Sequence, residues 1–260
     1  MTANSNHHAP EKRARMHERV SRVLLQRIIR GTLPVGSKLS TERALAAEFQ
    51  VNRATVREAL RYLENLELIA IRQGDGAYVQ SFLESGNLEM AKALMHVDET
   101  MRREVLSAIL EVRRINSPEV AYAAALRRSS VHLKQLEQAA LHSPNLPILE
   151  RDKRVHHIIG LASGNILQIL MTNFYEDFFY SFGHLYFGNE KNRHRSQVFH
   201  RDIYHAICEQ NAGVARDIMQ DVLQYAEHAV LEEIESKAVT GSVAAGGYPR
   251  HRNSPNWLNQ

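Results

Sequence analysis

Two short helical patterns separated by a three-residue turn constrain the fold of this chain more than any other feature. The segment ERALAAEF follows Thr41, the segment RATVREALRYLENLE follows Asn52, and both preceding residues are of types that cap helices. In the second pattern Val56, Leu60 and Leu63 share one apolar face, and the first turn carries small and basic residues. The pair predicts a helix-turn-helix, whose second helix places its N-terminal turn in the major groove of DNA, where arginine can donate two hydrogen bonds to guanine.

A predicted β-hairpin follows directly. The runs Leu68–Ile71 and Ala77–Val79 have the composition of short strands, and Gln73-Gly74-Asp75-Gly76 joins them with glycines that allow a positive φ. A hairpin at this place acts as a wing, whose tip can reach the minor groove or the DNA backbone. A helix expected over Arg13–Arg30 and ended by Gly31 precedes these elements. Together they predict a winged helix-turn-helix over residues 13–80.

The charge is distributed unevenly along the chain. Residues 1–80 carry thirteen Lys and Arg against eight Asp and Glu, a net charge of +5, whereas the remainder carries nineteen against twenty-one, a net charge of −2. A basic module joined to a near-neutral one suits a head that binds a polyanion on an independent body. The same imbalance is also common in proteins that never touch nucleic acid.

Length and composition exclude several other classes. A chain of 260 residues suits two domains better than one. Its apolar runs are too short for a membrane span, and its N-terminus lacks the apolar core of a secretory signal. The lone Cys208 fits a reducing compartment. We therefore expect a cytoplasmic, mainly α protein without a membrane partner.

From Ser81 onward the pattern is helical almost to the end, with breaks at Ser117-Pro118 and at Ser163-Gly164-Asn165. The expected helices are Asn87–His96, Thr100–Asn116, Pro118–Arg128, Val131–Leu141, Pro147–Ala162, Asn165–Phe187, Arg195–Gln210 and Ala212–Lys237. The expected division is a flexible arm (1–12), the winged helix-turn-helix (13–80), an all-α helical bundle for ligand binding and dimerisation (81–237) and a flexible tail (238–260).

The stretch Leu39–Val79 resembles the winged helix-turn-helix of the GntR family of regulators. The family pattern of L-P-[ST]-E-R-x-L-A, V-[ST]-R-x-T-V-R-E-A-L and G-x-G-[TA]-x-V stands here as LSTERALAAEF, VNRATVREAL and GDGAYV, with Ser40 in place of Pro and Asn52 in place of Ser or Thr. The resemblance implies that Asn52 is an N-cap and that Thr55 lies in the groove. It places Gln73 and Gly74 at the wing tip. The positions that contact phosphates and guanines are Arg43, Arg53 and Arg57.

The helical remainder resembles the FadR subfamily of that family through ILEVRR, DKRVHHIIGLASGN and HRDIYHAI, taken in order. The resemblance implies an all-α effector domain (the FCD type), a homodimer and a repressor or activator. Its partners would be a palindromic double-stranded DNA operator and a small-molecule effector that controls operator binding.

Many members of the subfamily hold a divalent metal, such as Zn or Ni, with one Asp and three His. Asp152 and His156 are four residues apart in a helical pattern, so they share a face, and His200 falls at the third ligand position. Val222 stands where the fourth ligand is expected, which leaves the set incomplete. In the alternative interpretation, these histidines line a cavity or are satisfied in the core.

The missing ligand also fits the branch of the subfamily that responds to fatty acyl-CoA. Arg113, in the LEVRR match, is a candidate anchor for an anionic effector, although a solvated or salt-bridged arginine explains it as well. An apolar face could accept an acyl chain or form an ordinary core; its members are Ile158, Ile159, Ile169, Met171, Phe174, Phe178 and Phe179.

An alternative function is a metal-dependent enzyme that uses Asp152, His156 and His200. Three protein ligands with an open position are typical of catalytic zinc. The chain has no H-E-x-x-H motif, nucleophile elbow or phosphate-binding glycine loop. The sequence therefore favours a regulator over an enzyme.

Overall fold

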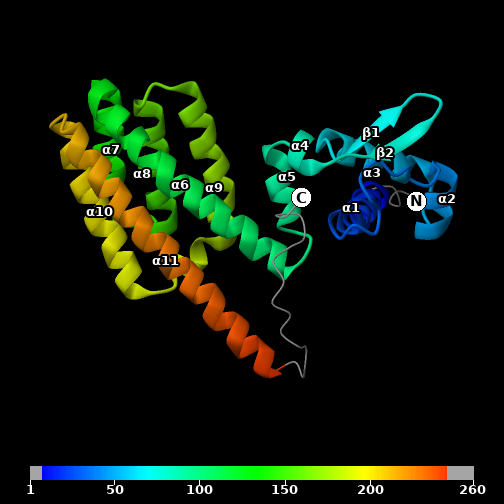
Figure 1. The fold of residues 1–260 in the computed structure, drawn as a ribbon. Coiled ribbons are helices and arrows are strands. Elements are labelled where there is room, and N and C mark those ends of the chain that lie inside the picture. The colour runs from blue at the N-terminus through cyan, green and yellow to red at the C-terminus, as the bar shows by residue number, and fades with distance from the viewer. Residues whose placement is uncertain (1–7, 245–260) are drawn as a thin grey trace, which may run out of the picture. The chain divides into compact units, whose positions relative to one another are not determined.

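The computed structural model describes residues 8–244, and the chain divides into two compact units, Met1–Leu106 and Ser107–Gln260. We call the first unit the head and the second unit the body. The elements of the head are α1 (His8–Ile29), α2 (Glu42–Phe49), α3 (Arg53–Asn65), β1 (Ile69–Arg72), β2 (Gly76–Val79), α4 (Phe82–Ser85) and α5 (Leu88–Leu94). Helices α1 and α2 both pack on α3, and the hairpin follows α3 in the chain (Figure 1). The predicted winged helix-turn-helix is therefore confirmed.

The hairpin is antiparallel and short. Its register pairs Ile69 with Val79 and Arg72 with Gly76. The segment before α2 adds to the other edge of β2, where the Leu39 backbone N–H donates to the Ala77 carbonyl at 2.8 Å. The wing is thus joined to the loop that leads into the helix-turn-helix.

The core of the head extends beyond the wing. Leu24, Leu63 and Leu68 are at most 1% exposed, and such burial stabilises by about 1.5–3 kcal/mol for each large aliphatic side chain. Met90, from α5, and Met101 belong to the same apolar cluster. The head therefore continues to Leu106, whereas the expected boundary lies at residue 80.

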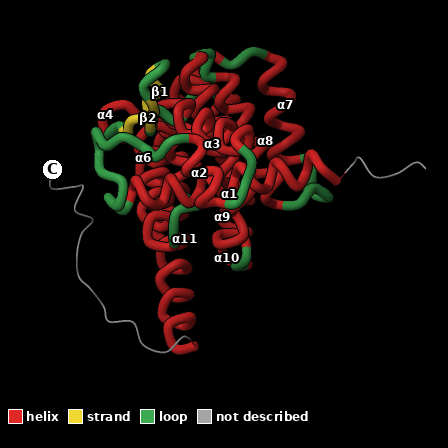
Figure 2. Tube along the Cα trace, turned by 90° about the vertical axis from the view of Figure 1, so that its right-hand side faces the viewer, coloured by secondary structure: helices red, strands yellow, loops and turns green. Residues whose placement is uncertain are grey.

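The body is all α. Its elements are α6 (Glu99–Arg127), which begins in the head, α7 (Ser130–Leu141), α8 (Ile148–Ala162), α9 (Ile166–Phe187), α10 (Glu190–Cys208) and α11 (Ala212–Ala244). Its core joins helices far apart in sequence, and Val155, Ile203 and Ala215 from α8, α10 and α11 are completely buried. The last turns of α11 extend past the ends of α9 and α10 (Figures 1 and 2). The expected all-α bundle is confirmed.

The expected break at Ser117-Pro118 is wrong, because α6 continues through Pro118. Proline removes one backbone donor from a helix interior and crowds the preceding turn, but packing can outweigh that cost. Here Ala121, Ala124 and Ala125, just after the proline, are completely buried in the body core. Tertiary packing of the second half of α6 therefore outweighs the local signal.

The ends of the chain also differ from expectation. Residues 8–12 of the expected arm belong to α1, and residues 238–244 of the expected tail belong to α11. The rest of the arm and tail lies outside the described residues. The short helix α4 was not predicted. Between residues 8 and 244, no helix is long and apolar enough to cross a membrane.

Candidate DNA-binding surface and effector pocket

Two capping side chains fix the first turns of α2 and α3. Thr41 Oγ1 accepts the Ala44 backbone N–H at 3.3 Å, and Asn52 Oδ1 accepts the Thr55 backbone N–H at 2.8 Å. Gln50 ends α2 in the left-handed conformation, with φ 54°, which lets the chain turn sharply into α3. The cap predicted for Asn52 is confirmed, and it leaves the basic first turn of α3 in a fixed orientation.

Three arginines of the predicted DNA contacts lie exposed on α2 and α3. Arg43 is on α2, and Arg53 and Arg57 are on α3. Arg57 is 59% exposed, and its Nε donates to both carboxylate oxygens of Glu42, at 2.8 and 3.0 Å. That ion pair joins α3 to the first turn of α2 and is accessible to solvent, where a phosphate can compete for the guanidinium.

Thr55 lies differently from expectation. Its side chain is only 2% exposed, and its hydroxyl donates to Asn52 Oδ1 at 3.0 Å. The hydroxyl thus supports the N-cap of α3, and it is not available on the surface for a base contact. We therefore correct the expected groove contact at Thr55 to a supporting role behind Arg53 and Arg57.

The wing tip carries a cluster that sequence reasoning missed. Gly74 has φ 77°, and the Asp75 backbone N–H closes the turn onto the Arg72 carbonyl at 3.1 Å. Asp75 accepts hydrogen bonds from Lys38 at 2.6 Å and from the Tyr78 hydroxyl at 2.8 Å. The bond to Lys38 raises the pKa of that amine and lowers the pKa of Asp75.

Two cations therefore accompany the expected Gln73 and Gly74, both of which are exposed at the tip. They are Lys38, beside Asp75, and Arg72, whose guanidinium carbon lies 4.5 Å from the centre of the Tyr78 ring. The positive charge of Arg72 within the hairpin could have drawn attention to it. No local signal in the sequence indicates Lys38, because it reaches the wing tip only through pairing of its segment with β2.

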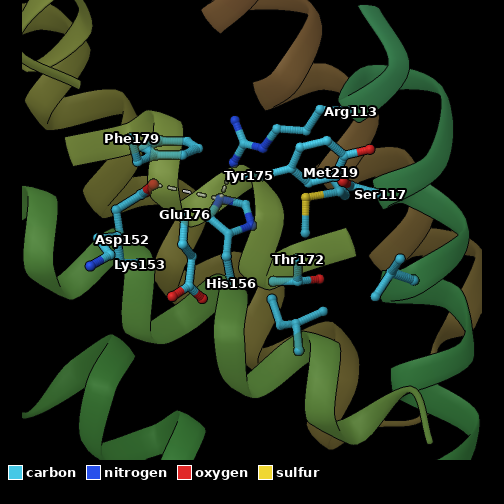
Figure 3. A pocket seen from close by; sticks show the side chains of 12 residues that line it. Arg113, Ser117, Asp152, Lys153, His156, Thr172, Tyr175, Glu176, Phe179 and Met219 are labelled. Carbon is cyan, nitrogen blue, oxygen red and sulfur yellow. Dashed lines mark hydrogen bonds and ion pairs between the residues drawn. The ribbon is translucent and has the colours of Figure 1, made fainter. Parts of the chain in front are cut away.

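A buried polar cluster lies in the body, where α6, α8 and α10 meet. The Arg113 guanidinium donates to His156 Nε2 at 3.0 Å, and its carbon lies 4.2 Å from the centre of the Phe179 ring. Asp152 Oδ1 accepts from His200 Nε2 at 2.8 Å and from the Ser196 hydroxyl at 3.0 Å. Figure 3 shows Arg113 and Asp152 on opposite sides of His156. The structure thus brings together all three predicted metal ligands and the predicted effector anchor.

Burial shifts the charges in this cluster. It lowers the pKa of Arg113 to about 10, although Asp152 attracts the cation, so Arg113 stays charged near neutral pH. Burial and the charge of Arg113 lower the pKa of His156 to about 3, so His156 is neutral. Burial alone would raise the pKa of Asp152, but His156, the hydrogen bond from His200 and Arg113 hold it below its ordinary value. The cluster therefore contains one buried cation and one buried anion.

The donor atoms do not fit a resident metal ion as they lie. The Nε2 lone pair of His156 accepts from Arg113, and Asp152 Oδ2 lies 3.6 Å from that same nitrogen. Val222, at the expected fourth position, is buried in the apolar core. Among the residues that the structure describes, no group of three or more His, Cys, Asp and Glu has the arrangement of a metal site. The cation of this cluster is the Arg113 guanidinium and not a metal ion.

The cavity beside the cluster is small. It measures about 20 Å³, room for about one water molecule, and its lining includes Arg113, Asp152, His156, Tyr175 and Phe179 (Figure 3). Ile159 and Phe178, from the face considered for an acyl chain, are at most 7% exposed, and Ile159 belongs to the body core. A ligand larger than a few atoms has to open this cavity.

Comparison with known proteins covers both units. Residues 16–79 match the family described as bacterial regulatory proteins, gntR family, and residues 80–233 match the FadR C-terminal domain. The HTH-type transcriptional regulator Mce2R of Mycobacterium tuberculosis is 27% identical over 234 residues, covering 88% of this chain and 97% of that protein. The fatty acid metabolism regulator protein of Shewanella sp. strain MR-7 is 25% identical over 187 residues, covering 69% and 75%.

A solved structure of a Streptococcus agalactiae GntR protein is 27% identical, with a TM-score of 0.44, and covers 82% of this chain and 99% of that one. These families and relatives are regulators, and they give no support to the metal-dependent enzyme considered as the alternative. The head carries the exposed basic surface of a DNA-binding module, and the match to the FadR C-terminal domain includes most of the body. The chain belongs to the GntR family of bacterial DNA-binding transcription regulators and carries a FadR-type C-terminal domain.

Proposed function

We propose that this regulator acts as a homodimer on a palindromic operator, and that a small organic acid bound at Arg113 changes its affinity for that DNA. One observation carries the effector half of the proposal. Arg113 is a guanidinium only 6% exposed, and its hydrogen-bonding partner His156 is neutral. A buried charge is costly unless it is paired; Asp152 attracts the guanidinium, but the hydrogen bond of Arg113 goes to neutral His156, which favours an anionic ligand at this place.

The DNA half of the proposal rests on the head. Arg53 and Arg57 project from the first two turns of α3, Arg43 lies on α2, and the wing adds Lys38 and Arg72. In a homodimer, two such surfaces would meet two half-sites about one helical turn of DNA apart. The arginines would specify bases, whereas the wing cations would hold phosphates.

The effector half rests on the donors that Arg113 has left. A guanidinium has five N–H donors in a fixed fork that suits a carboxylate, and His156 accepts from only one of its nitrogens in this structure. Because Asp152 is held by His200 and Ser196, an incoming carboxylate can bind Arg113 without displacing Asp152 from those two donors. The small cavity limits what lies directly beside Arg113 to a short acidic group. A long-chain acyl-CoA is the second candidate, favoured by the name of the Shewanella relative.

The test uses the full-length protein and DNA from upstream of its own gene. Operator affinity is measured by fluorescence anisotropy without ligand and with separate panels of small carboxylates and acyl-CoAs. We expect at least one small carboxylate to change the affinity in the wild type and to have a much weaker effect in Arg113→Lys, which keeps the buried charge but loses the fork. Equal responses in both proteins, or a response to acyl-CoA alone, would overturn the assignment. Arg201→Gln, an exposed change on α10, is the control.

A further inference from the structure

A second hollow adjoins the Arg113 cavity. It is a groove of about 730 Å³ between α7, α8 and α9, far larger than the cavity itself. Lys153 and Glu176 line both spaces, so these two side chains form the wall between them. Lys153 is only 8% exposed, and Figure 3 shows it beside Asp152, with Glu176 on the neighbouring helix. A ligand anchored at Arg113 can therefore extend into the groove once this wall shifts.

The charge of the groove is not balanced. Its two carboxylates are both engaged, since Glu176 lies 3.0 Å from His157 Nδ1 and Glu150 lies 4.0 Å from Lys153 Nζ. Lys134 on α7 and Arg154 on α8 also line the groove, and both are exposed. Within residues 8–244, no ion pair joins either of them to a carboxylate. The charge that the groove offers to a ligand is therefore positive.

We propose that the effector is an elongated molecule with two acidic groups, one held by Arg113 in the cavity and the other by Lys134 and Arg154 in the groove. This inference rests on the proposed function, because it takes Arg113 as the first anchor. Two cationic anchors in adjoining spaces select a dianion over a monoanion of the same length, since the second group adds charge-assisted hydrogen bonds. The second acid can be a carboxylate or a phosphate, because both suit lysine and arginine.

The binding of such a ligand also explains how the small cavity opens. To pass from one space to the other, the ligand must displace Lys153 and Glu176, which lie on α8 and α9. The ion pair between Glu176 and His157 is partly exposed, with 23% and 42% of the side chains accessible, so its loss costs little. The Glu176 side of the wall is therefore weak enough for a dianion to displace.

The probes are α,ω-dicarboxylates from succinate to dodecanedioate, the monocarboxylates of equal length, and ω-phosphono carboxylates. Calorimetry on the full-length protein gives the affinity of each. We expect the best diacid to bind about fivefold to tenfold more tightly than its monoacid. The double variant Lys134→Gln with Arg154→Gln should lose this preference and keep the affinity for the monoacid. Both changes are on exposed side chains, so folding is not at risk; Arg201→Gln is again the control.

The outcomes separate the two proposals. If the double variant keeps the preference for diacids, or if the wild type has none, the groove is not part of the site, and an Arg113→Lys variant that weakens monoacid binding would still support the proposed function. If no acid binds the wild type, both proposals fail. A preference for the phosphonate over the diacid that is lost in the double variant supports the groove site and identifies the second group as phosphate-like.

Discussion

The head and the body use charged side chains in opposite ways. In the head, Arg57 and Lys38 are 59% and 47% exposed and pair with carboxylates at the surface. In the body, Arg113 and Asp152 are 6% and 4% exposed, and their charges are fixed by hydrogen bonds inside the bundle. Exposed pairs contribute little to stability and exchange partners easily, whereas a buried pair that loses one member is strongly destabilised. Removing a charge in the head should therefore change binding, and removing a charge in the body cluster should change folding.

The largest effect is expected for Asp152→Ala. This change leaves Arg113 and His200 without the buried carboxylate and should lower the free energy of unfolding by about 3–5 kcal/mol. Urea denaturation at neutral pH measures it. The matched control is Asp221→Ala, whose carboxylate is 75% exposed and pairs with Arg195, and which should cost less than about 1 kcal/mol. Equal losses in the two variants would mean that the buried cluster does not differ from a surface pair.

Arg53→Ala and Arg57→Ala should weaken DNA binding and leave stability almost unchanged. Each should weaken operator binding by about 1–3 kcal/mol for a lost base contact and reduce the ratio of specific to non-specific affinity. The free energy of unfolding should stay within about 0.5 kcal/mol of the wild type, because both side chains are exposed. Anisotropy with operator and scrambled DNA, beside urea denaturation, measures both quantities. Wild-type specificity in both variants would refute the assignment of α3 as the recognition helix.

Thr55 tests whether a residue of the recognition helix α3 affects stability rather than DNA binding. Thr55→Val removes the hydroxyl that donates to Asn52 and should cost about 1 kcal/mol of stability, while the specificity ratio is unchanged. Thr55→Ser keeps the hydroxyl and is the control for the hydrogen bond. A large fall in specificity with unchanged stability in the valine variant would show that Thr55 contacts a base after all.

Lys38→Ala should have a smaller effect that depends on salt. If Lys38 neutralises one phosphate, the slope of log affinity against log salt should fall by about one, equally for operator and scrambled DNA. The measurement is a salt titration of both DNAs, with Lys191→Ala in the body as control. An unchanged slope would show that Asp75 keeps Lys38 from the DNA.

Added metal should have no effect. After dialysis against a chelator, zinc or nickel should leave the thermal midpoint unchanged, because the lone pair of His156 is used by Arg113. A site filled at a hundredfold excess over its Kd would stabilise the fold by about 2.7 kcal/mol, which thermal melting detects easily. A stoichiometric ion by elemental analysis, lost in His200→Ala, would contradict this expectation.

The head was predictable because its signals are local. Thr41 and Asn52 cap helices within three residues of themselves, and Gly74 lies at the turn that its sequence indicates. The groove contact expected for Thr55 was wrong because helical spacing alone did not show that its side chain is buried and bonded to the Asn52 cap. The helix break expected at Pro118 was wrong because packing of the alanines that follow it outweighs the tendency of proline to end a helix.

The body cluster was only partly predictable. The spacing of Asp152 and His156 placed them on one face, and a family resemblance added His200 and Arg113. Nothing local in the sequence shows that Arg113 donates to His156, forty-three positions away, because that contact exists only once α6 and α8 have packed. The groove beside it could not be predicted either, since three helices form it.

The extent of the head core has a practical consequence for anyone who isolates the DNA-binding part. A fragment that ends near residue 80, where the family match to the head stops, would omit Met90, Leu94, Val97 and Met101. These side chains are at most 8% exposed and belong to the head core, so their removal would leave the truncated protein with an apolar surface prone to aggregation. A soluble fragment has to run to Leu106, which means cutting inside helix α6.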